Sequence, residues 1–388
     1  MYDFDKLIDR KGTECIKWDL VDRVFGSKDV IPLWIADMDF EVLPELQEAM
    51  IKRASHPSFG YTTPAPAYRE NIIKWNRERN GLELEKEDIV GIPGVVTAIA
   101  FALHALTEKG DKVLINTPVY NPFASTIKAL ERQLVTSSLK CEGFRRSMDF
   151  EDMEEKMKDG VKMMILCNPH NPVGRVWTRE ELNRLVELCS RYGVYLFSDE
   201  IHSDICYGGH KHCSILTVSD RAREIAVCAM APSKTFNIAG LKSSMFIIKN
   251  PELREKISAG IHAFHVGVDL MAYKATEICY GCGGRWVDEL NEYLYGNAKF
   301  VTEFCEKRMP KVKTFVPEGT YLMWLDFSAY GLTQDDLMEK LKTEAKVGMN
   351  SGTVFGEEGI GFARLNIGCP RFMLEKAMIQ IKAAFDQD

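Results

Sequence analysis

The sequence predicts an α/β protein in which a mainly parallel β-sheet lies between layers of helices. Between about residues 60 and 285, helical patterns alternate with short apolar runs, and this alternation is the signature of a parallel sheet covered by helices. Two of the runs, Lys162–Cys167 and Gly193–Ser198, are nearly continuous in apolar residues. Such runs are typical of strands that are buried on both faces.

The apolar runs define five expected strands. They are Lys112–Asn116, Lys162–Cys167, Val194–Ser198, Ile225–Cys228 and Ser244–Ile248. We also expect three helices in this part of the chain, two of them followed by a helix-ending glycine. They cover the residues from the Pro64/Pro66 turn to Arg79, Val95–Thr107 and Arg179–Tyr192.

After about residue 284 the pattern changes to that of a smaller α+β unit. The expected elements are a long helix over Trp286–Lys307, strands around Val312 and over Tyr321–Phe327, a helix from Thr333 and a final helix after Pro370. A chain of 388 residues suits two domains. We expect a large domain of residues 46–284, and a small domain made of residues 1–45 and 285–388.

The composition is that of an ordinary soluble globular protein rather than a nucleic-acid-binding protein. The 49 Lys and Arg residues are outnumbered by 56 Asp and Glu and form no basic stripe, so no nucleic-acid partner is expected. The N-terminus is charged from Asp3 and predicts neither a signal peptide nor a membrane span. The 11 cysteines are odd in number and irregularly spaced, which favours reduced thiols in the cytoplasm over disulfides.

Two charged residues follow expected strands and mark a candidate site. Lys234 comes shortly after the run Ile225–Cys228 and lies among small residues, although a lysine in such a place is by itself usually solvated. Asp199 directly follows Val194–Ser198, and because a buried carboxylate is costly unless paired, it predicts a buried cationic partner. Open α/β sheets bind ligands at the carboxyl ends of their strands.

Two further segments lie at the ends of expected elements. Asn168–Gly174 follows the run Lys162–Cys167, and its Asn-Pro pairs favour a turn. Pro93–Thr97 opens an apolar helix, whose free N–H groups and positive dipole end suit a phosphate group. Each signal is weak alone, and the order of all four along the chain is what makes them informative.

That order resembles the fold type I enzymes that use pyridoxal 5'-phosphate (PLP), the aspartate aminotransferase superfamily, over essentially the whole chain. The resemblance implies a large PLP-binding domain with a mainly parallel, seven-stranded-type sheet and a smaller α+β domain. It also implies that Lys234 binds PLP covalently and acts as a catalytic base, that Asp199 pairs with the pyridinium nitrogen, and that Asn171 bonds the phenolic oxygen.

The same resemblance implies the other contacts to the cofactor. Tyr120 is expected to stack on the pyridine ring and to take part in catalysis. His202 and Lys242 stand where many relatives have a tyrosine and an arginine, and Ala231 stands where they have a serine that binds phosphate. The residues expected at the phosphate are Gly94, Val95, Val96 and Ser233.

The resemblance further implies a small-molecule amino-acid substrate and a homodimer with composite active sites. Tyr61 resembles a tyrosine that reaches the phosphate, and the substrate, of the neighbouring subunit. Arg364 is in the place of an arginine that binds the substrate carboxylate, for which a planar fork of N–H groups is suited. Asn171 and Ala36 are also expected to contact the substrate.

Five strings resemble the bacterial carbon-sulfur lyases and cystathionine β-lyases of the MalY/PatB type: WIADMDF, FGYTTP, NPHNPVG, SDEIHSD and PSKTFNIAGL. This branch implies α,β-elimination from L-cystathionine or a related L-cysteine S-conjugate, giving pyruvate, ammonia and a thiol. Two alternatives stay open, namely an aminotransferase acting between an L-amino acid and a 2-oxo acid, and a regulatory binding protein that retains PLP. The sequence does not fix the natural substrate.

Two other segments are interpreted as surface features. His210 and His212 beside Cys213 are read as a surface loop rather than a metal site, since no spaced partner cluster follows them. The charged run Glu151–Lys158 is interpreted as a solvated helix face.

Overall fold

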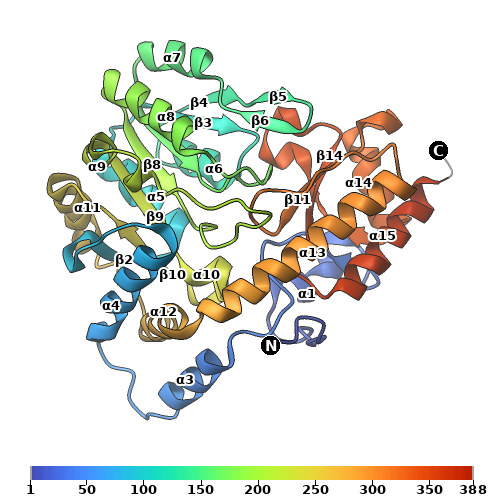
Figure 1. Ribbon diagram of the computed structural model, residues 1–388, viewed down its shortest axis with the longest axis horizontal. Helices are drawn as coiled ribbons and strands as arrows, with labels where there is room; N and C mark the ends of the chain where they lie inside the picture. The colour runs from blue at the N-terminus through green and yellow to red at the C-terminus, as the bar shows by residue number, and fades with distance from the viewer. Residues whose placement is uncertain (1, 387–388) are drawn as a thin grey trace.

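A seven-stranded sheet forms the centre of the larger part of the protein in the computed structural model, which describes residues 2–386 (Figure 1). Its strands, in spatial order, are β2 (Ile89–Pro93), β10 (Ser243–Ile247), β9 (Ala226–Met230), β8 (Tyr195–Asp199), β7 (Val161–Cys167), β3 (Lys112–Thr117) and β4 (Gln133–Ser138). Only β10 pairs antiparallel with its neighbours. The sheet is therefore mainly parallel, as the sequence predicts.

Helices cover both faces of this sheet. Side chains on one face, such as Val113 and Ile115, pack against α5 (Val95–Leu106), α6 (Pro122–Ala129) and α11 (Pro251–Ala263). Alternate side chains belong to the core on the other face, which includes residues of α4 (Pro66–Trp75), α7 (Phe150–Lys158), α8 (Arg179–Arg191) and α12 (Leu270–Cys282). Apolar residues on both faces explain the continuous apolar runs of these strands.

The C-terminal part of the chain forms a second, smaller layer of strands and helices. A long helix, α13 (Gly284–Arg308), leads to the antiparallel strands β11 (Leu322–Asp326), β14 (Phe362–Asn366) and β13 (Asn350–Ser351). Helices α14 (Gln334–Thr343) and α15 (Arg371–Phe385) complete this part. The N-terminal region joins it, because β1 (Ile31–Pro32) pairs with β12 (Val347–Gly348).

Most expected elements agree with the structure to within a few residues. The helix expected to reach Arg79 is divided into α4 and a π-helical turn over Asn76–Asn80, and Gly81 follows with a φ of 61°. The strand expected around Val312 is wrong, because only an isolated bridge between Lys313 and Asp326 is present there. The edge strands β2 and β4 were not expected from the sequence.

Two expectations about the environment of the chain can be compared with the structure. Within residues 2–386, no helix combines the length and the apolar character that a membrane span requires. All eleven cysteines are described and none of them forms a disulfide, in agreement with the reduced thiols expected from their irregular spacing.

Candidate active site

A cavity of about 400 Å³ lies at the carboxyl ends of β7, β8 and β9. Parallel strands place the residues that follow them at one edge of the sheet, which explains why segments distant in sequence meet there. The cavity brings together eleven of the thirteen predicted site residues. They are Ala36, Gly94, Val95, Val96, Tyr120, Asn171, Asp199, His202, Ser233, Lys234 and Lys242.

Lys234 lies on α10 (Pro232–Thr235), a single turn that follows β9 and begins at Pro232. Proline suits this first helical position because its fixed φ matches a helix and its missing N–H is not needed there. The Lys234 Nζ donates a hydrogen bond to the backbone carbonyl of Ala36 at 2.6 Å. Loss of hydration lowers the pKa of Lys234 to about 8, so this amine loses its proton much more readily near physiological pH than an ordinary lysine does.

Asp199 is the last residue of β8 and is only 4% exposed. Its Oδ1 accepts a hydrogen bond from the backbone N–H of Ile201 at 3.1 Å. Burial raises the pKa of Asp199 to about 7. The cationic side chain expected beside it is not found, because none within residues 2–386 forms an ion pair with it. Lys234 contributes only a weaker electrostatic attraction.

Arg364, on β14, does not itself line the cavity, but it donates a hydrogen bond to Asn171, which does. Its Nη1 donates to Asn171 Oδ1 at 3.1 Å, and its Nη2 donates to the Trp34 carbonyl at 2.8 Å and to Asn350 Oδ1 at 2.7 Å. All of these acceptors are neutral, and the buried Nε has no partner. Burial lowers the pKa of Arg364 to about 10, and among residues 2–386 no carboxylate forms an ion pair with this buried cation.

Two aromatic side chains and a histidine complete the wall. His202 is buried, its Nδ1 has no hydrogen-bond partner, and burial lowers its pKa to about 3, so the ring is neutral. Its ring centroid lies 5.7 Å from that of Tyr321. Tyr321 donates its hydroxyl to the Ala36 carbonyl at 2.8 Å. Burial, followed by the Asp199 charge, raises the pKa of Tyr120.

The turn before α5 offers backbone donors to the cavity. Gly94 is the N-cap of this helix and has a φ of 97°, a conformation that favours glycine. Its own N–H bonds to Ser244 Oγ at 2.8 Å. The first N–H groups of a helix have no intrahelical acceptor, so those that follow Gly94 can bind an anion at this wall. Lys242 lies on the same cavity, and no carboxylate within residues 2–386 forms an ion pair with it.

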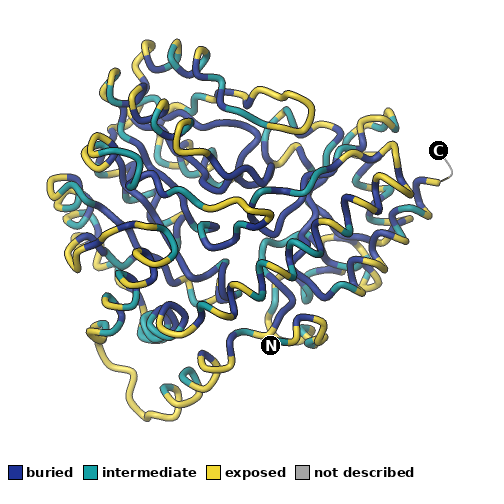
Figure 2. Tube along the Cα trace, in the orientation of Figure 1, coloured by how far each residue is buried: buried dark blue, intermediate teal, exposed yellow. Residues whose placement is uncertain are grey.

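Tyr61 is the predicted site residue that the structure does not bring to the cavity. It is fully exposed on the connection between α3 (Pro44–Ala54) and α4, which Figure 2 shows as an exposed segment that projects from the molecule. Phe59, on the same segment, is 63% exposed. Within one chain, this tyrosine contributes nothing to the site.

The interpretation of His210–Cys213 as a surface loop is wrong for His212. Its side chain is buried, and its Nε2 lies 2.9 Å from Glu200 Oε2. Ser198 Oγ and the backbone N–H of Ile215 also donate to this carboxylate. These three contacts hold Glu200, the residue that follows Asp199, in place. Within residues 2–386, no group of three or more His, Cys, Asp or Glu side chains could hold a metal ion.

Sequence reasoning did not find the residues that hold Arg364 and Ala36 in place. Tyr321 was expected only as part of a strand, and Asn350 follows no motif. Their roles depend on contacts across the fold, and nothing in the periodicity of the sequence indicates them.

Known proteins of similar sequence and structure share this arrangement of the chain. The family of class I and II aminotransferases matches residues 28–381. Cystathionine beta-lyase PatB of Bacillus subtilis (strain 168) is 43% identical over 383 residues, which cover 98% of this chain and 99% of the relative. The structure of cystalysin from Treponema denticola, which contains PLP, has a TM-score of 0.97 at 34% identity and covers 100% of this chain and 99% of that chain.

A second solved structure has the same fold. It is the PLP-bound C-S lyase from Staphylococcus hominis, with a TM-score of 0.91 at 31% identity, covering 99% of this chain and 98% of that chain. Because the family match and the relatives extend over nearly the whole sequence, the chain belongs to the family of class I and II aminotransferases.

Proposed function

We propose that the protein is a PLP-dependent carbon-sulfur β-lyase that acts on L-cystathionine or related L-cysteine S-conjugates. The products are a thiol, pyruvate and ammonia. The observation that carries this proposal is one cavity that is lined by the Lys234 amine and the Asp199 carboxylate and is bonded through Asn171 to the buried Arg364 guanidinium. Within residues 2–386, neither Asp199 nor Arg364 forms an ion pair. The identity of 43% with a cystathionine beta-lyase supports elimination as the reaction.

The residues of the cavity fit PLP. The Asp199 carboxylate is buried without an ion-pair partner, and a protonated ring nitrogen would supply the missing positive charge. The N–H groups at the start of α5, together with Ser233 and Lys242, would hold the phosphate. Asn171 and His202 would face the ring's polar edge, and Tyr120 its face. When bound, PLP supplies the electron sink for carbanion chemistry.

The residues of the chain then have separate tasks in the reaction. The Arg364 fork would bind the α-carboxylate of the substrate, which is the anion that this buried cation lacks. The Lys234 amine, with a pKa of about 8, would take the proton from the substrate Cα at its Nζ. The bond between Cβ and sulfur then breaks and the thiolate leaves. The remaining three-carbon fragment hydrolyses to pyruvate and ammonia.

We also propose that the protein is a homodimer in which each active site contains residues of both copies. Tyr61 and Phe59 expose large aromatic surfaces on a projecting segment, and such side chains are usually covered by a partner. In a homodimer, Tyr61 would complete the cavity of the second copy. Eleven free thiols support a reducing compartment, so we place the enzyme in the cytoplasm.

A product assay on L-cystathionine without any 2-oxo acid tests the reaction. We expect pyruvate, ammonia and thiol in equal amounts, because elimination needs no amino acceptor. An amino-group transfer that strictly requires a 2-oxo acid would instead make the protein an aminotransferase, as the family name allows. Bound PLP with no turnover of any cysteine conjugate or amino donor would favour a regulatory role.

A further inference from the structure

A loop segment lies against the amine of Lys234. The segment Trp34–Phe40, called here the 34–40 segment, contains no helix or strand. Its Ala36 carbonyl accepts hydrogen bonds from Lys234 Nζ at 2.6 Å and from the Tyr321 hydroxyl at 2.8 Å. Because no secondary structure fixes this loop, other contacts must determine where the carbonyl lies.

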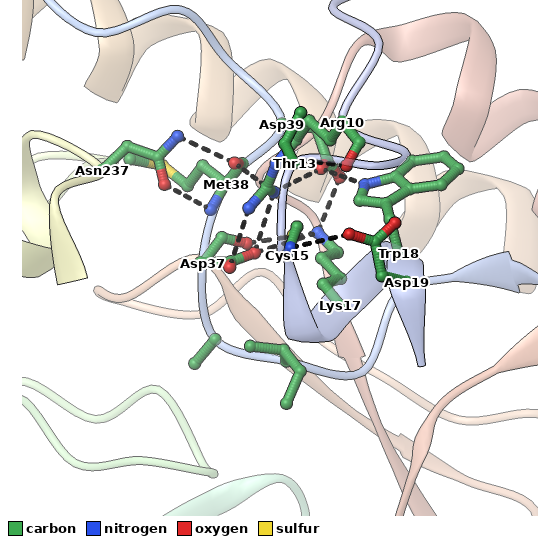
Figure 3. A network of polar contacts seen from close by, with 12 residues as sticks. Arg10, Thr13, Cys15, Lys17, Trp18, Asp19, Asp37, Met38, Asp39 and Asn237 are labelled. Carbon is green, nitrogen blue, oxygen red and sulfur yellow. Dashed lines mark hydrogen bonds and ion pairs between the residues drawn. The ribbon is translucent and has the colours of Figure 1, made fainter. Parts of the chain in front are cut away.

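Four charged side chains form a cluster of ion pairs that joins the segment to the N-terminal residues. They are Arg10, Lys17, Asp37 and Asp39, called here the Lys17 cluster (Figure 3). Lys17 Nζ lies 2.6 Å from Asp39 Oδ2. Arg10 reaches both carboxylates, at 2.7 Å from Asp39 Oδ1 and at 3.0 Å from Asp37 Oδ2. Trp18 Nε1 donates to Asp39 Oδ1 at 2.8 Å.

The cluster is buried and electrically balanced. The side chains of Lys17 and Asp39 are 0% and 1% exposed, and two cations face two carboxylates. Removing one partner would leave a buried charge without compensation, so a displaced arrangement is strongly disfavoured. Compared with apolar packing, a buried ion pair contributes little to stability, and its benefit is a single well-defined geometry.

A second set of contacts joins the segment to the loop that carries Lys234. Asn237, three residues after Lys234, accepts from the Met38 N–H at 2.9 Å and donates to the carbonyls of Met38 at 2.8 Å and Phe40 at 3.0 Å. Figure 3 shows these contacts of Asn237 with Met38 beside the Lys17 cluster. The bond from Lys234 Nζ to the Ala36 carbonyl continues the path of contacts from the cluster, through the 34–40 segment, to the amine.

We propose that the Lys17 cluster is a positioning unit, which fixes the Ala36 carbonyl against the Lys234 amine and so directs that amine toward the substrate Cα. The inference rests on the proposed function, in which Lys234 takes the Cα proton. A neutral amine that donates one N–H to a fixed carbonyl has its lone pair oriented. None of the four residues lines the cavity, and Asp37 and Asp39 belong to the segment that carries the Ala36 carbonyl. Asp37 in addition attracts the Lys234 amine electrostatically when that amine is protonated.

Two variants of the full-length holoenzyme test this role. Asp39→Asn removes one charge of the cluster, and the milder Trp18→Phe removes one hydrogen bond to Asp39. We expect kcat with L-cystathionine to fall roughly ten- to hundredfold for Asp39→Asn, since small misplacements of a reacting group have effects of this size. KM should change little. The isotope effect on kcat with Cα-deuterated substrate should rise, because proton removal becomes slower.

Hydrogen exchange provides a readout that does not depend on turnover. The backbone amides of residues 34–40, measured by mass spectrometry, should exchange faster in both variants than in the wild type. A purely structural role would lower the melting temperature and the active fraction but leave the isotope effect unchanged. If Asp39→Asn does not fold, Trp18→Phe alone tests the inference. Its kcat, isotope effect and amide exchange should then change in the same directions as expected for Asp39→Asn, but by smaller amounts.

Lys6→Gln is the matched control. Lys6 forms an ion pair with Glu41, which also joins the N-terminal residues to the end of the segment, but both side chains are about half exposed. This variant should behave as the wild type in every measurement. Unchanged exchange of residues 34–40 and an unchanged isotope effect in folded variants would overturn the inference. A failure of the proposed function can be told apart from a failure of this inference. In that case the wild type itself would release no pyruvate from L-cystathionine in the absence of a 2-oxo acid.

Discussion

At the scale of single residues, two buried charged groups meet at the site without an ion pair to any residue of the range 2–386: Asp199 lines the cavity, and Arg364 bonds to Asn171 in its lining. Burial raises the pKa of Asp199 to about 7 and lowers the pKa of Arg364 to about 10, so both shifts favour the neutral form. A ligand that brings a cationic ring nitrogen to Asp199 and a carboxylate to Arg364 would restore both charges. Perturbed pKa values of this kind cluster at functional sites.

Arg364→Lys should weaken substrate use while the protein still binds PLP. Lysine keeps the charge but presents a point donor in place of a planar pair. A hydrogen bond to a charged group contributes about 1.5 to 3 kcal/mol, so we expect kcat/KM to fall roughly ten- to hundredfold. Steady-state kinetics and the melting temperature should be measured on one preparation.

Arg371→Lys is the control for this substitution. Arg371 also donates to an asparagine, Asn297 Oδ1 at 2.8 Å, but Asn297 does not line the cavity, whereas Asn171, the partner of Arg364, does. Its kcat/KM should remain that of the wild type. If Arg364→Lys lowered the melting temperature and left KM unchanged, Arg364 would be a structural residue.

At the scale of elements, the strands that carry the site could be predicted from the sequence, whereas the edge strands could not. β7 and β8 are nearly continuous in apolar residues because helices cover both of their faces. β4 is an edge strand with mostly exposed or half-exposed residues, and β2 contains Gly91 and Pro93, so neither has a strong pattern.

Some residues of the candidate site could likewise be predicted from the sequence, whereas others could not. Lys234, Asp199 and Asn171 follow strands in a recognisable order, and that order predicted that they would meet. The Lys17 cluster was not predicted, because charged residues in an irregular segment are normally solvated. Only contacts between distant parts of the chain bury Lys17 and Asp39, and such contacts leave no periodic signal.

A buried histidine in the turn Asn168–Gly174 should make the stability of the protein depend on pH. His170 in this turn is buried, its Nε2 lies 2.8 Å from the Pro118 carbonyl, and its Nδ1 has no partner. Burial lowers the pKa of His170 from its ordinary value of 6.5 to about 4. Between these values the unfolded chain binds more protons than the folded one. The contribution of His170 to the free energy of unfolding should therefore decrease as the pH falls from about 6.5 to about 4.

Urea unfolding of the wild type and of His170→Gln between pH 7 and pH 4.5 checks this. The variant should lose the part of the pH dependence that comes from His170. The contributions of His202, whose pKa is lowered to about 3, and of Asp199, whose raised pKa of about 7 acts with the opposite sign, are the same in both proteins. Equal pH dependence in the two proteins would contradict the role of His170.

At the scale of the whole molecule, the cavity is built from two parts of the chain. Asp199 comes from the large sheet and Lys234 from α10, which follows strand β9 of that sheet, whereas Ala36 comes from the N-terminal region. Arg364, which bonds to Asn171 in the lining, comes from the smaller sheet. The pairing of β1 with β12 joins the two ends of the chain. We propose that residues 46–284 form one domain, and that residues 1–45 and 285–388 form the other, with the site between them.

Mixing two defective variants tests the composite dimer. Lys234→Ala should be inactive and Tyr61→Phe should be impaired. In a hybrid dimer, the cavity with Lys234 from one copy would receive Tyr61 from the other, so the mixture should exceed the summed activities of the parents. Sedimentation should show a dimer. A fully active monomer would contradict the composite site.

The most direct test of the central claim, that Lys234 binds PLP and performs the chemistry, is the site of attachment of the cofactor. Borohydride reduction of the holoenzyme makes the bond between lysine and PLP permanent, and peptide mapping by mass spectrometry then locates it. We predict one adduct at Lys234, together with loss of pyruvate formation after reduction. Lys234→Ala should show neither the adduct nor activity. An adduct at a different lysine, or pyruvate formation by Lys234→Ala at the wild-type rate, would contradict the claim.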